Sequence, residues 1–515
     1  MYLALSSKIV QIDEYSEKTL KIPLRTLMER SGRAVERALR ENVKPGSRVV
    51  LLAGSGNNGG DGYAFASMIA DDYDTVIYDI FDKGQKTDEG NYFLSLLKKK
   101  GAKIIPLTLD DETLATIKGA DCIVDAVFGT GFVGEMPEIV GKLIAAVNSS
   151  HHAFKIAIDV PLGVNADDGT ISEAYACSVN LTVSLCFIKP GLVSYPARSF
   201  VGKIVYDDIG LPLDKLEDRF DFKYMMTDGE LASRLLPERT ENGSKGSFGK
   251  LLMITGSDKY RGAAHLTAEG ALRGGVGYVV YFGNESLSHD LSLRFPEIVF
   301  EHTEGNRLTD ADVSRALSLS KEVSAILIGS GSSVSDELYS LISSLLSTDG
   351  APLILDADAI NAMAEHREEA LRLLRDTKRS VVLTPHPLEF ARLKGTSVKE
   401  VQSARIGEAM EFAEEYGCTL ILKGAGTVVA SADKVYINST GSSALSKAGT
   451  GDVLAGLVSS LIASGGDPTD SGAAAVYYHG LAADVLADEL SVFGVTPSDL
   501  PREIARRIAD GRKSK

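Results

Sequence analysis

Two carboxylates at the ends of predicted strands are the residues of the first half of the chain best placed to exchange protons. Asp125 lies near the end of the apolar run 122–127, and Asp159 lies in the run 155–160. A single carboxylate at such a place is often only a turn or capping residue. Two of them, each beside a glycine loop, favour one shared site. Paired carboxylates can divide the work, with one binding a cation while the other moves protons.

A glycine-rich loop follows an earlier predicted strand of the first half. Residues 54–62 read Gly-Ser-Gly-Asn-Asn-Gly-Gly-Asp-Gly and come directly after the apolar run 48–53. Glycines let backbone amides point at phosphate oxygens without a Cβ in the way, and a following helix adds its positive end. A tight turn would explain the glycines alone. The amide oxygens of Asn57 and Asn58 can also bind a cation or a polar ligand, which favours a nucleotide-type site.

The second half of the chain carries a different glycine loop. Residues 448–452 read Ala-Gly-Thr-Gly-Asp and open an apolar helical stretch. Amides at a helix start can stabilise charge on a transferring phosphoryl group, and Asp452 can take the proton of the hydroxyl that is phosphorylated. A plain capped helix could have the same sequence. The segment 423–427, Lys-Gly-Ala-Gly-Thr, follows the predicted strand 419–422 and favours a nucleotide site.

Further polar or glycine-rich segments of the second half also follow predicted strands. His386 stands between two prolines after the run 380–383. A lone histidine is more often structural, but this position on a strand-end loop favours a side chain that faces a ligand. Similar segments occupy 256–264, 328–331 and 355–361.

The elements that must position these residues alternate between apolar strands and helices. Continuous apolar strands separated by helices indicate a parallel sheet covered on both faces, with functional loops at the carboxyl ends of the strands. In the first half we predict strands over 49–53, 75–80, 122–127 and 155–160, and helices over 24–39, 62–71, 89–99 and 136–147. In the second half we predict strands over 250–255, 278–282, 325–328, 352–356, 380–383 and 419–422, and long final helices after 451 and from 471.

The chain has 515 residues, more than one core usually organises, so we expect two domains. The periodic pattern weakens in a charged stretch after residue 213. We therefore predict a first domain over 1–213, a linker over 214–225 and a second domain over 226–515.

Composition limits the classes of partner. The net charge of −16 argues against a general binder of nucleic acid or anionic membranes. No run approaches ~18 uninterrupted apolar residues, so we expect no membrane span. The cysteines, which show no metal-ligand or paired spacing, fit a reducing cytoplasm; they are Cys122, Cys177, Cys186 and Cys418. We expect a cytoplasmic homo-oligomer that acts on small molecules.

The first half resembles the NAD(P)H-hydrate epimerase domain over roughly residues 9–212. That domain interconverts the R and S forms of hydrated NADH or NADPH at the nicotinamide C6. The resemblance rests on GNNGGDG at 56–62, on Asp125 with FGTGFVGE at 128–135, and on DVPLGV at 159–164. It implies a Rossmann-like parallel-sheet domain in which Asp159 acts as acid or base on the substrate.

The same resemblance implies a potassium ion and a set of residues that bind the hydrate. Asn58 and Asp125 match the positions that bind potassium. The family usually has Ser where this chain has Leu162, so Leu162 could hold the ion only through its backbone carbonyl. The implied hydrate-binding residues are Asn57, Asn58, Gly59, Gly60, Asp61, Gly129, Thr130, Gly131, Phe132, Val133, Gly134, Glu135 and Asp159.

The second half resembles the ADP-dependent NAD(P)H-hydrate dehydratase domain, a ribokinase-like branch, over roughly residues 226–510. That enzyme uses ADP with Mg²⁺ to phosphorylate the C6 hydroxyl of the S hydrate, and loss of phosphate restores the ring. The implied hydrate-binding residues are Ala263, Gly331, His386 and Asp452, with Asp452 as base. The implied ADP- or AMP-binding residues are Lys423, Gly424, Ala425, Gly426, Thr427 and Gly451.

Together these patterns predict an α/β protein with a Rossmann-like domain followed by a ribokinase-like domain. The predicted function is repair of hydrated NADH and NADPH by epimerisation and then ADP-dependent dehydration, with release of AMP and phosphate. The alternative is a ribokinase-like kinase of a vitamin or another small molecule, with a non-catalytic nucleotide-binding first domain. The sequence leaves open the choices between ADP and ATP and between the NADH and NADPH hydrates.

Overall fold

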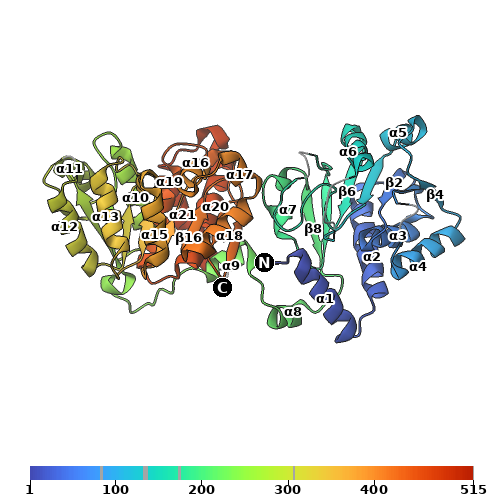
Figure 1. Cartoon of the computed structure of the whole chain (residues 1–515), viewed down its shortest axis with the longest axis horizontal. Helices are drawn as coiled ribbons and strands as arrows, with labels where there is room; N and C mark the ends of the chain where they lie inside the picture. Colours follow the sequence, from blue (N-terminus) through green and yellow to red (C-terminus); the bar gives the residue numbers. More distant parts are fainter. Residues whose placement is uncertain (82–84, 132–136, 172–174, 306–307, 514–515) are drawn as a thin grey trace. The chain divides into compact units, whose positions relative to one another are not determined.

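The computed structural model describes residues 1–515 except 82–84, 132–136, 172–174, 306–307 and 514–515. The chain divides into two compact units, Tyr2–Tyr224 and Met225–Lys515, with Met1 grouped with the second. Each unit contains a sheet with helices packed around it (Figure 1).

The first unit contains a seven-stranded sheet in the order β4-β3-β2-β5-β6-β7-β8. Neighbouring strands pair in parallel throughout. The predicted α/β alternation is confirmed, and the sequence analysis missed β1, β4, β7, β8, α1, α5, α7 and α8. The elements are β1 (Tyr2–Leu3), α1 (Ser6–Lys18), α2 (Leu24–Asn42), β2 (Arg48–Ala53), α3 (Asn57–Ile69), β3 (Asp74–Asp79), α4 (Asp88–Lys99), β4 (Lys103–Pro106), α5 (Asp111–Lys118), β5 (Cys122–Ala126), α6 (Glu138–Ser149), β6 (Phe154–Ile158), β7 (Leu181–Leu185), α7 (Pro190–Val193), β8 (Lys203–Asp207) and α8 (Leu213–Arg219).

Strand β2 shows why this sheet is apolar on both faces. Val49 and Leu51 pack with α1 to α4, whereas Val50 and Leu52 pack with α5 and α6. Figure 1 shows α5 and α6 on the opposite side of the sheet from α2, α3 and α4. Because β2 and β5 are neighbours and the chain runs outward from them in both directions, the loops after these two strands meet at a topological switch point. This is where sheets of this type bind ligands.

The stretch that we expected as a linker is folded into the first unit up to Tyr224. Leu216 of α8 is completely buried, and both Leu216 and Phe222 belong to the apolar core of that unit. The charged residues of α8 lie on its exposed side. The charge pattern therefore marks the solvent face of a short helix, and the division between the units falls after it.

The strands of the second unit follow the order β9-β18-β17-β16-β15-β14-β13-β10-β11-β12. Strands β10 to β16 pair in parallel, and β17 and β18 extend the sheet in antiparallel fashion. The elements are β9 (Tyr224–Thr227), α9 (Gly229–Arg234), β10 (Lys250–Ile254), α10 (Arg261–Gly274), β11 (Tyr278–Gly283), α11 (Glu285–Arg294), β12 (Val299–His302), α12 (Asp310–Leu319), β13 (Ala325–Ile328), α13 (Asp336–Leu346), β14 (Leu353–Leu355), α14 (Asp358–Glu365), α15 (Arg367–Asp376), β15 (Val381–Leu383), α16 (Pro387–Lys394), α17 (Val398–Ser403), α18 (Arg405–Tyr416), β16 (Thr419–Leu422), β17 (Val428–Ala430), β18 (Val435–Asn438), α19 (Thr450–Ala463), α20 (Pro468–Gly494) and α21 (Leu500–Lys513).

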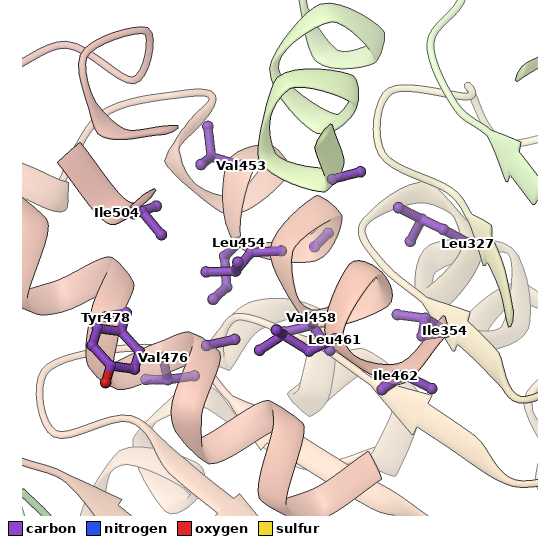
Figure 2. Close-up of a cluster of buried hydrophobic side chains, with 14 of the residues drawn as sticks. Leu327, Ile354, Val453, Leu454, Val458, Leu461, Ile462, Val476, Tyr478 and Ile504 are labelled. Carbon is purple, nitrogen blue, oxygen red and sulfur yellow. The ribbon is translucent and has the colours of Figure 1, made fainter. Parts of the chain in front are cut away.

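Helix α19 is the central helix of this unit, with every residue from Val453 to Ala463 buried. Its side chains pack with sheet residues such as Leu327 and Ile354, and with α20 and α21 (Figure 2). Helices α10 and α19 can approach closely because Gly456 has no side chain. A Cβ at this position would lie 2.1 Å from the carbonyl oxygen of Thr267 on α10. This close packing fixes the amino end of α19, which carries Asp452, beside α10.

Candidate functional site

A pocket of about 410 Å³ opens at the carboxyl end of the first sheet, where the loops after β2, β5, β6 and β7 meet helices α1 and α2. The predicted residues that line it are Asn57, Asn58, Asp61, Gly129, Thr130, Gly131 and Asp159. The predicted residues Phe132, Val133, Gly134 and Glu135 lie outside the described residues.

Gly59 and Gly60 are buried behind the pocket wall and have packing roles. A Cβ at Gly59 would lie 2.0 Å from the carbonyl oxygen of Gly54, and one at Gly60 would lie 2.5 Å from the methyl carbon of Met28. Gly56, in contrast, has open space at its Cβ position and lines the pocket. Several glycines of this loop therefore let α3 pack against its neighbours, and Gly56 leaves room for a ligand.

Helix α3 begins at Asn57, and Gly56 at its N-cap has no side chain to satisfy the amides of the first turn. Those amides and the positive end of the helix dipole point towards the pocket. This arrangement suits an anionic group such as a phosphate.

The residues predicted to hold a cation lie beside this helix start. The Nδ2 of Asn58 donates to the carbonyl of Phe128 over 2.9 Å, and its buried Oδ1 has no partner among the described residues. The carboxylate of Asp125 accepts the amides of Val127 at 3.2 Å and of Leu162 at 2.7 Å. The Leu162 carbonyl already accepts the amide of Cys177 at 2.8 Å. The unpartnered oxygen of Asn58 is the feature here that best fits a cation ligand.

Asp159 forms a buried ion pair with Lys189, a residue that the sequence analysis did not select. Asp159 has a φ of 66°, an unusual value for a residue other than glycine, and its carboxylate also accepts the amide of Leu185 at 3.1 Å. The ammonium group of Lys189 donates to the carbonyl of Leu185 over 2.8 Å. The lysine and the turn together fix the position of this carboxylate at the edge of the pocket.

Three more carboxyl groups, those of Asp61, Asp13 and Glu89, line the same pocket. Burial raises the pKa of Asp61 well above its usual value; the charge of Asp159 adds to this effect, and a hydrogen bond with Ser31 opposes it. Burial raises the pKa of Asp13 to about 6 against the opposing charge of Lys189. Asp13 lies on α1, where no motif marks it, so sequence reasoning missed it.

In the second unit, the carboxyl ends of four neighbouring strands form one polar network around Asp356. Ser330 after β13 donates to its Oδ2 at 2.8 Å, and Thr384 after β15 donates to its Oδ1 at 2.7 Å. Lys423 after β16 forms an ion pair with the same Oδ1 at 2.9 Å. Asp356 itself is 1% exposed. The sequence analysis quoted these strand-end segments but assigned only Lys423 among the four residues.

Asp452 lies in the first turn of α19, after a glycine N-cap at Gly449 that has a φ of 99°. A Cβ at Gly451 would lie 3.3 Å from the Nζ of Lys423, so the lysine approaches this turn closely. Burial raises the pKa of Asp452 to about 7, and the charge of Asp356 adds to the effect while Lys423 opposes it. The site thus contains a carboxyl group that can exchange a proton near neutral pH, beside helix amides and a cation.

The buried side chain of Arg405 stabilises the loop between β16 and β17 by hydrogen bonds to its backbone. Arg405 donates to the carbonyls of Leu422 at 2.9 Å and of Lys423 at 3.3 Å. Gly424 and Gly426 both have positive φ, and the Thr427 hydroxyl donates to the Gly424 carbonyl over 2.9 Å. The predicted segment from Lys423 through Ala425 to Thr427 is therefore a tight, braced turn beside the start of α19.

The other predicted residues of the second unit have more varied surroundings. The Nδ1 of His386 accepts the amides of Leu388 and Glu389 at 3.2 Å, and its Nε2 lies 3.2 Å from Glu389. His386 is thus the N-cap of α16, so its side chain has a structural role. It also lies on the loop beside Lys423, whose amide donates to the carbonyl of Pro385. Ala263 packs next to Gly331, where a Cβ would lie 2.6 Å from the Ala263 Cβ.

Among the residues that the structure describes, no group of three or more His, Cys, Asp or Glu side chains could hold a metal ion. No described helix combines the length and apolar character that crossing a membrane requires.

Comparisons with known proteins match both units. A family model described as NAD(P)H-hydrate dehydratase matches residues 251–506, and one described as YjeF-related protein N-terminus matches residues 24–191. The bifunctional NAD(P)H-hydrate repair enzyme Nnr of Moorella thermoacetica is 31% identical over 514 residues, which cover 97% of this chain and 95% of the relative. The enzyme of the same name from Escherichia coli K12 is 31% identical over 495 residues, which cover 95% and 90%.

A solved structure supports the fold. The crystal structure of a ribokinase-like superfamily protein from Enterococcus faecalis V583 matches with a TM-score of 0.50 at 21% identity, covering 57% of this chain and 98% of that one. This likeness shows a ribokinase-like fold.

Proposed function

Because the chain belongs to the family of bifunctional NAD(P)H-hydrate repair enzymes, we propose that it restores hydrated NADH and NADPH to the reduced nucleotides in two steps. The first unit interconverts the R and S hydrates at C6. The second unit transfers a phosphoryl group from ADP to the C6 hydroxyl of the S hydrate, and loss of phosphate regenerates the nicotinamide ring. The products are AMP, phosphate and NADH or NADPH.

The observation that carries the dehydratase proposal is the position of Asp452. Its carboxyl group lies in the first turn of α19, beside the amide of Gly451 and close to Lys423. In this proposal Asp452 takes the hydroxyl proton while the helix amides and Lys423 stabilise the phosphoryl group in transfer. Phosphorylation is chemically necessary because hydroxide leaves poorly and phosphate leaves readily.

The nucleotide lies along the turn 423–427 in this proposal. Its residues Lys423, Gly424 and Thr427 would hold ADP. Arg405 stabilises the turn through hydrogen bonds to its backbone carbonyls. Since the described residues contain no cluster of three metal ligands, Mg²⁺ would enter bound to the nucleotide phosphates. Ala263, Gly331 and His386 would contact the hydrate.

In the first unit, the hydrate occupies the pocket with its phosphates at the start of α3. Asp159, held in place by its ion pair with Lys189, exchanges the proton of the C6 hydroxyl. A potassium ion would supply positive charge near the nucleotide, and Asn58 with Asp125 would hold it, because the Asn58 Oδ1 is buried without a partner among the described residues. The Leu162 carbonyl would contribute only through its remaining lone pair.

One incubation tests both activities. A mixture of the two hydrate epimers is supplied with ADP, and the recovery of reduced nucleotide and the release of phosphate are followed. We expect complete recovery for the wild type, and recovery that stops at the S fraction for Asp159→Asn. Unchanged R-to-S conversion in that variant would remove Asp159 from the mechanism. A stable phosphoester formed on a vitamin alcohol, with no hydrate turnover, would support the kinase alternative instead.

A further inference from the structure

The pocket of the first unit has an apolar wall formed by residues outside the strand-end motifs. Helices α1 and α2 build this wall, and among its described residues Asp13 is the ionisable one. The apolar side chains of this wall are those of Ile9, Val10, Leu24, Leu27 and Met28. Asp159 and Lys189 enter the same pocket from the loops after β6 and β7. The pocket therefore presents carboxyl groups from two different walls.

The carboxyl groups of this pocket differ in their partners. Asp159 has Lys189 and the amide of Leu185, and Asp61 has a hydrogen bond with Ser31. Within the described part of the chain, no group donates a hydrogen bond to Asp13. Asp13 is thus a carboxyl group with a free proton-exchanging end that faces the cavity.

The groups that face Asp13 act on it in opposite directions, because the charge of Lys189 lowers its pKa and that of Asp159 raises it. They are Lys189 after β7, Asp159 after β6 and Asp61 on α3, and Glu89 of α4 also lines the pocket. Burial raises the pKa of Asp13 to about 6, and the nearby charge of Asp159 adds to this. Asp159 is held in an ion pair with Lys189 and Asp13 is not, and two carboxyl groups with such different surroundings can divide the roles of base and acid.

We propose that Asp13 is the second acid–base group of the epimerase site and protonates the ring nitrogen of the hydrate while Asp159 takes the hydroxyl proton. This inference rests on the proposed epimerase function of the first unit. Asp13 lies outside residues 24–191, which the family model of that unit matches, so the match does not address it.

The chemistry of the substrate calls for such a pair. The hydrate carries a hydroxyl on C6, a saturated carbon bonded to the ring nitrogen N1, with a single bond between C5 and C6. Asp159 takes the hydroxyl proton, the C6–O bond becomes a carbonyl, and the C6–N1 bond breaks. N1 receives its proton from Asp13. After rotation about C5–C6, N1 returns that proton to Asp13 and attacks the other face of the carbonyl, whose oxygen takes the proton back from Asp159.

The test compares Asp13→Asn with the wild type and with Glu14→Gln, a change to an exposed neighbour on the same helix. R-to-S conversion is measured over a range of pH, ADP-dependent dehydration of pure S hydrate by the same preparation reports whether the second unit is folded, and thermal melting reports on the first unit. We expect Asp13→Asn to lower epimerisation by about 100-fold or more, with dehydration and the melting temperature of the first unit maintained. Glu14→Gln should leave both activities unchanged.

The pH profile separates a chemical role from a structural one. A proton donor works in its protonated form, so wild-type epimerisation should fall as pH rises above about 6, and the residual activity of Asp13→Asn should lose this fall. A loss smaller than about threefold, or a lower rate with the wild-type pH profile retained, would overturn the proposal. A wild type that dehydrates S hydrate but never converts R to S would instead refute the epimerase function itself.

Discussion

The two units place similar groups at the carboxyl ends of their sheets but pair them differently. In the first unit Lys189 contacts Asp159, the carboxylate predicted to act on the substrate. In the second unit Lys423 contacts Asp356, and Asp452 has no ion-pair partner among the described residues. Lys189 fixes the position of the Asp159 carboxylate, whereas burial raises the pKa of Asp452 to about 7. The two proposed bases therefore differ in how they are held: Asp159 contacts a lysine, whereas Asp452 stands in the first turn of α19 without an ion-pair partner among the described residues.

The helix starts of the two units show a related difference. Both α3 and α19 begin after a glycine N-cap that offers no side-chain cap, so both leave amides free for an anion. In α19 a lysine and a carboxyl group of raised pKa stand at the same turn. In α3 the turn faces a wide pocket whose ionisable groups come from other elements. The second site is organised for phosphoryl transfer, and the first for binding a nucleotide beside separate acid–base groups.

The largest effect is expected from Asp452→Asn. Removing the base should lower ADP-dependent dehydration by about 10²- to 10⁴-fold and leave R-to-S conversion unchanged, because the epimerase pocket is built entirely from the first unit. Phosphate release and recovery of reduced nucleotide from S hydrate measure the loss. Asp336→Asn, at a side chain 96% exposed on α13, is the control that should behave as wild type. Equal loss in both activities would argue against separate sites.

The next effect concerns the buried ion pair of the first unit. Lys189→Met leaves Asp159 buried without its cation, which should destabilise that unit by about 3–5 kcal/mol and abolish epimerisation. Chemical denaturation followed by a probe in the first unit measures the change. Lys142→Met removes an exposed lysine and should change stability little. Full stability in Lys189→Met would show that the ion pair with Asp159 contributes little to the folding of this unit.

Glycine substitutions should separate packing from ligand approach. Gly59→Ala puts a methyl group 2.0 Å from a backbone oxygen and should cost about 1–3 kcal/mol of first-unit stability. Gly56→Ala meets nothing within 4 Å and should cost less than about 1 kcal/mol. If Gly56 faces the nucleotide, its variant should raise KM for the hydrate with little change in melting temperature. The reverse order of stabilities would contradict these roles.

Sequence reasoning located the parts of each site that lie in one segment of chain. The apolar runs before Asp159 and Lys423 predicted strands, and strand ends with glycine loops predicted ligand-binding edges. It could not show which groups meet. Lys189, which follows β7, pairs with Asp159, which follows β6, and Asp13 enters the pocket from a helix with no motif. The charged stretch near Leu216 looked like a linker because its buried residues are few.

The glycines illustrate a second limit. The motif 56–62 predicts backbone freedom for a phosphate, yet Gly59 and Gly60 serve close packing of α3. Hydrophobic periodicity cannot distinguish these roles, since both require the absence of a Cβ. His386 is a similar case, because a histidine between prolines on a loop can cap a helix as well as face a ligand.

The most direct test is the pH dependence of both activities in one preparation of the intact chain. Dehydration needs ionised Asp452 and should fall as pH drops below about 7. Epimerisation needs protonated Asp13 and should fall as pH rises above about 6. The account predicts that the two rates change in opposite directions across this range. Two profiles that rise and fall together would contradict it.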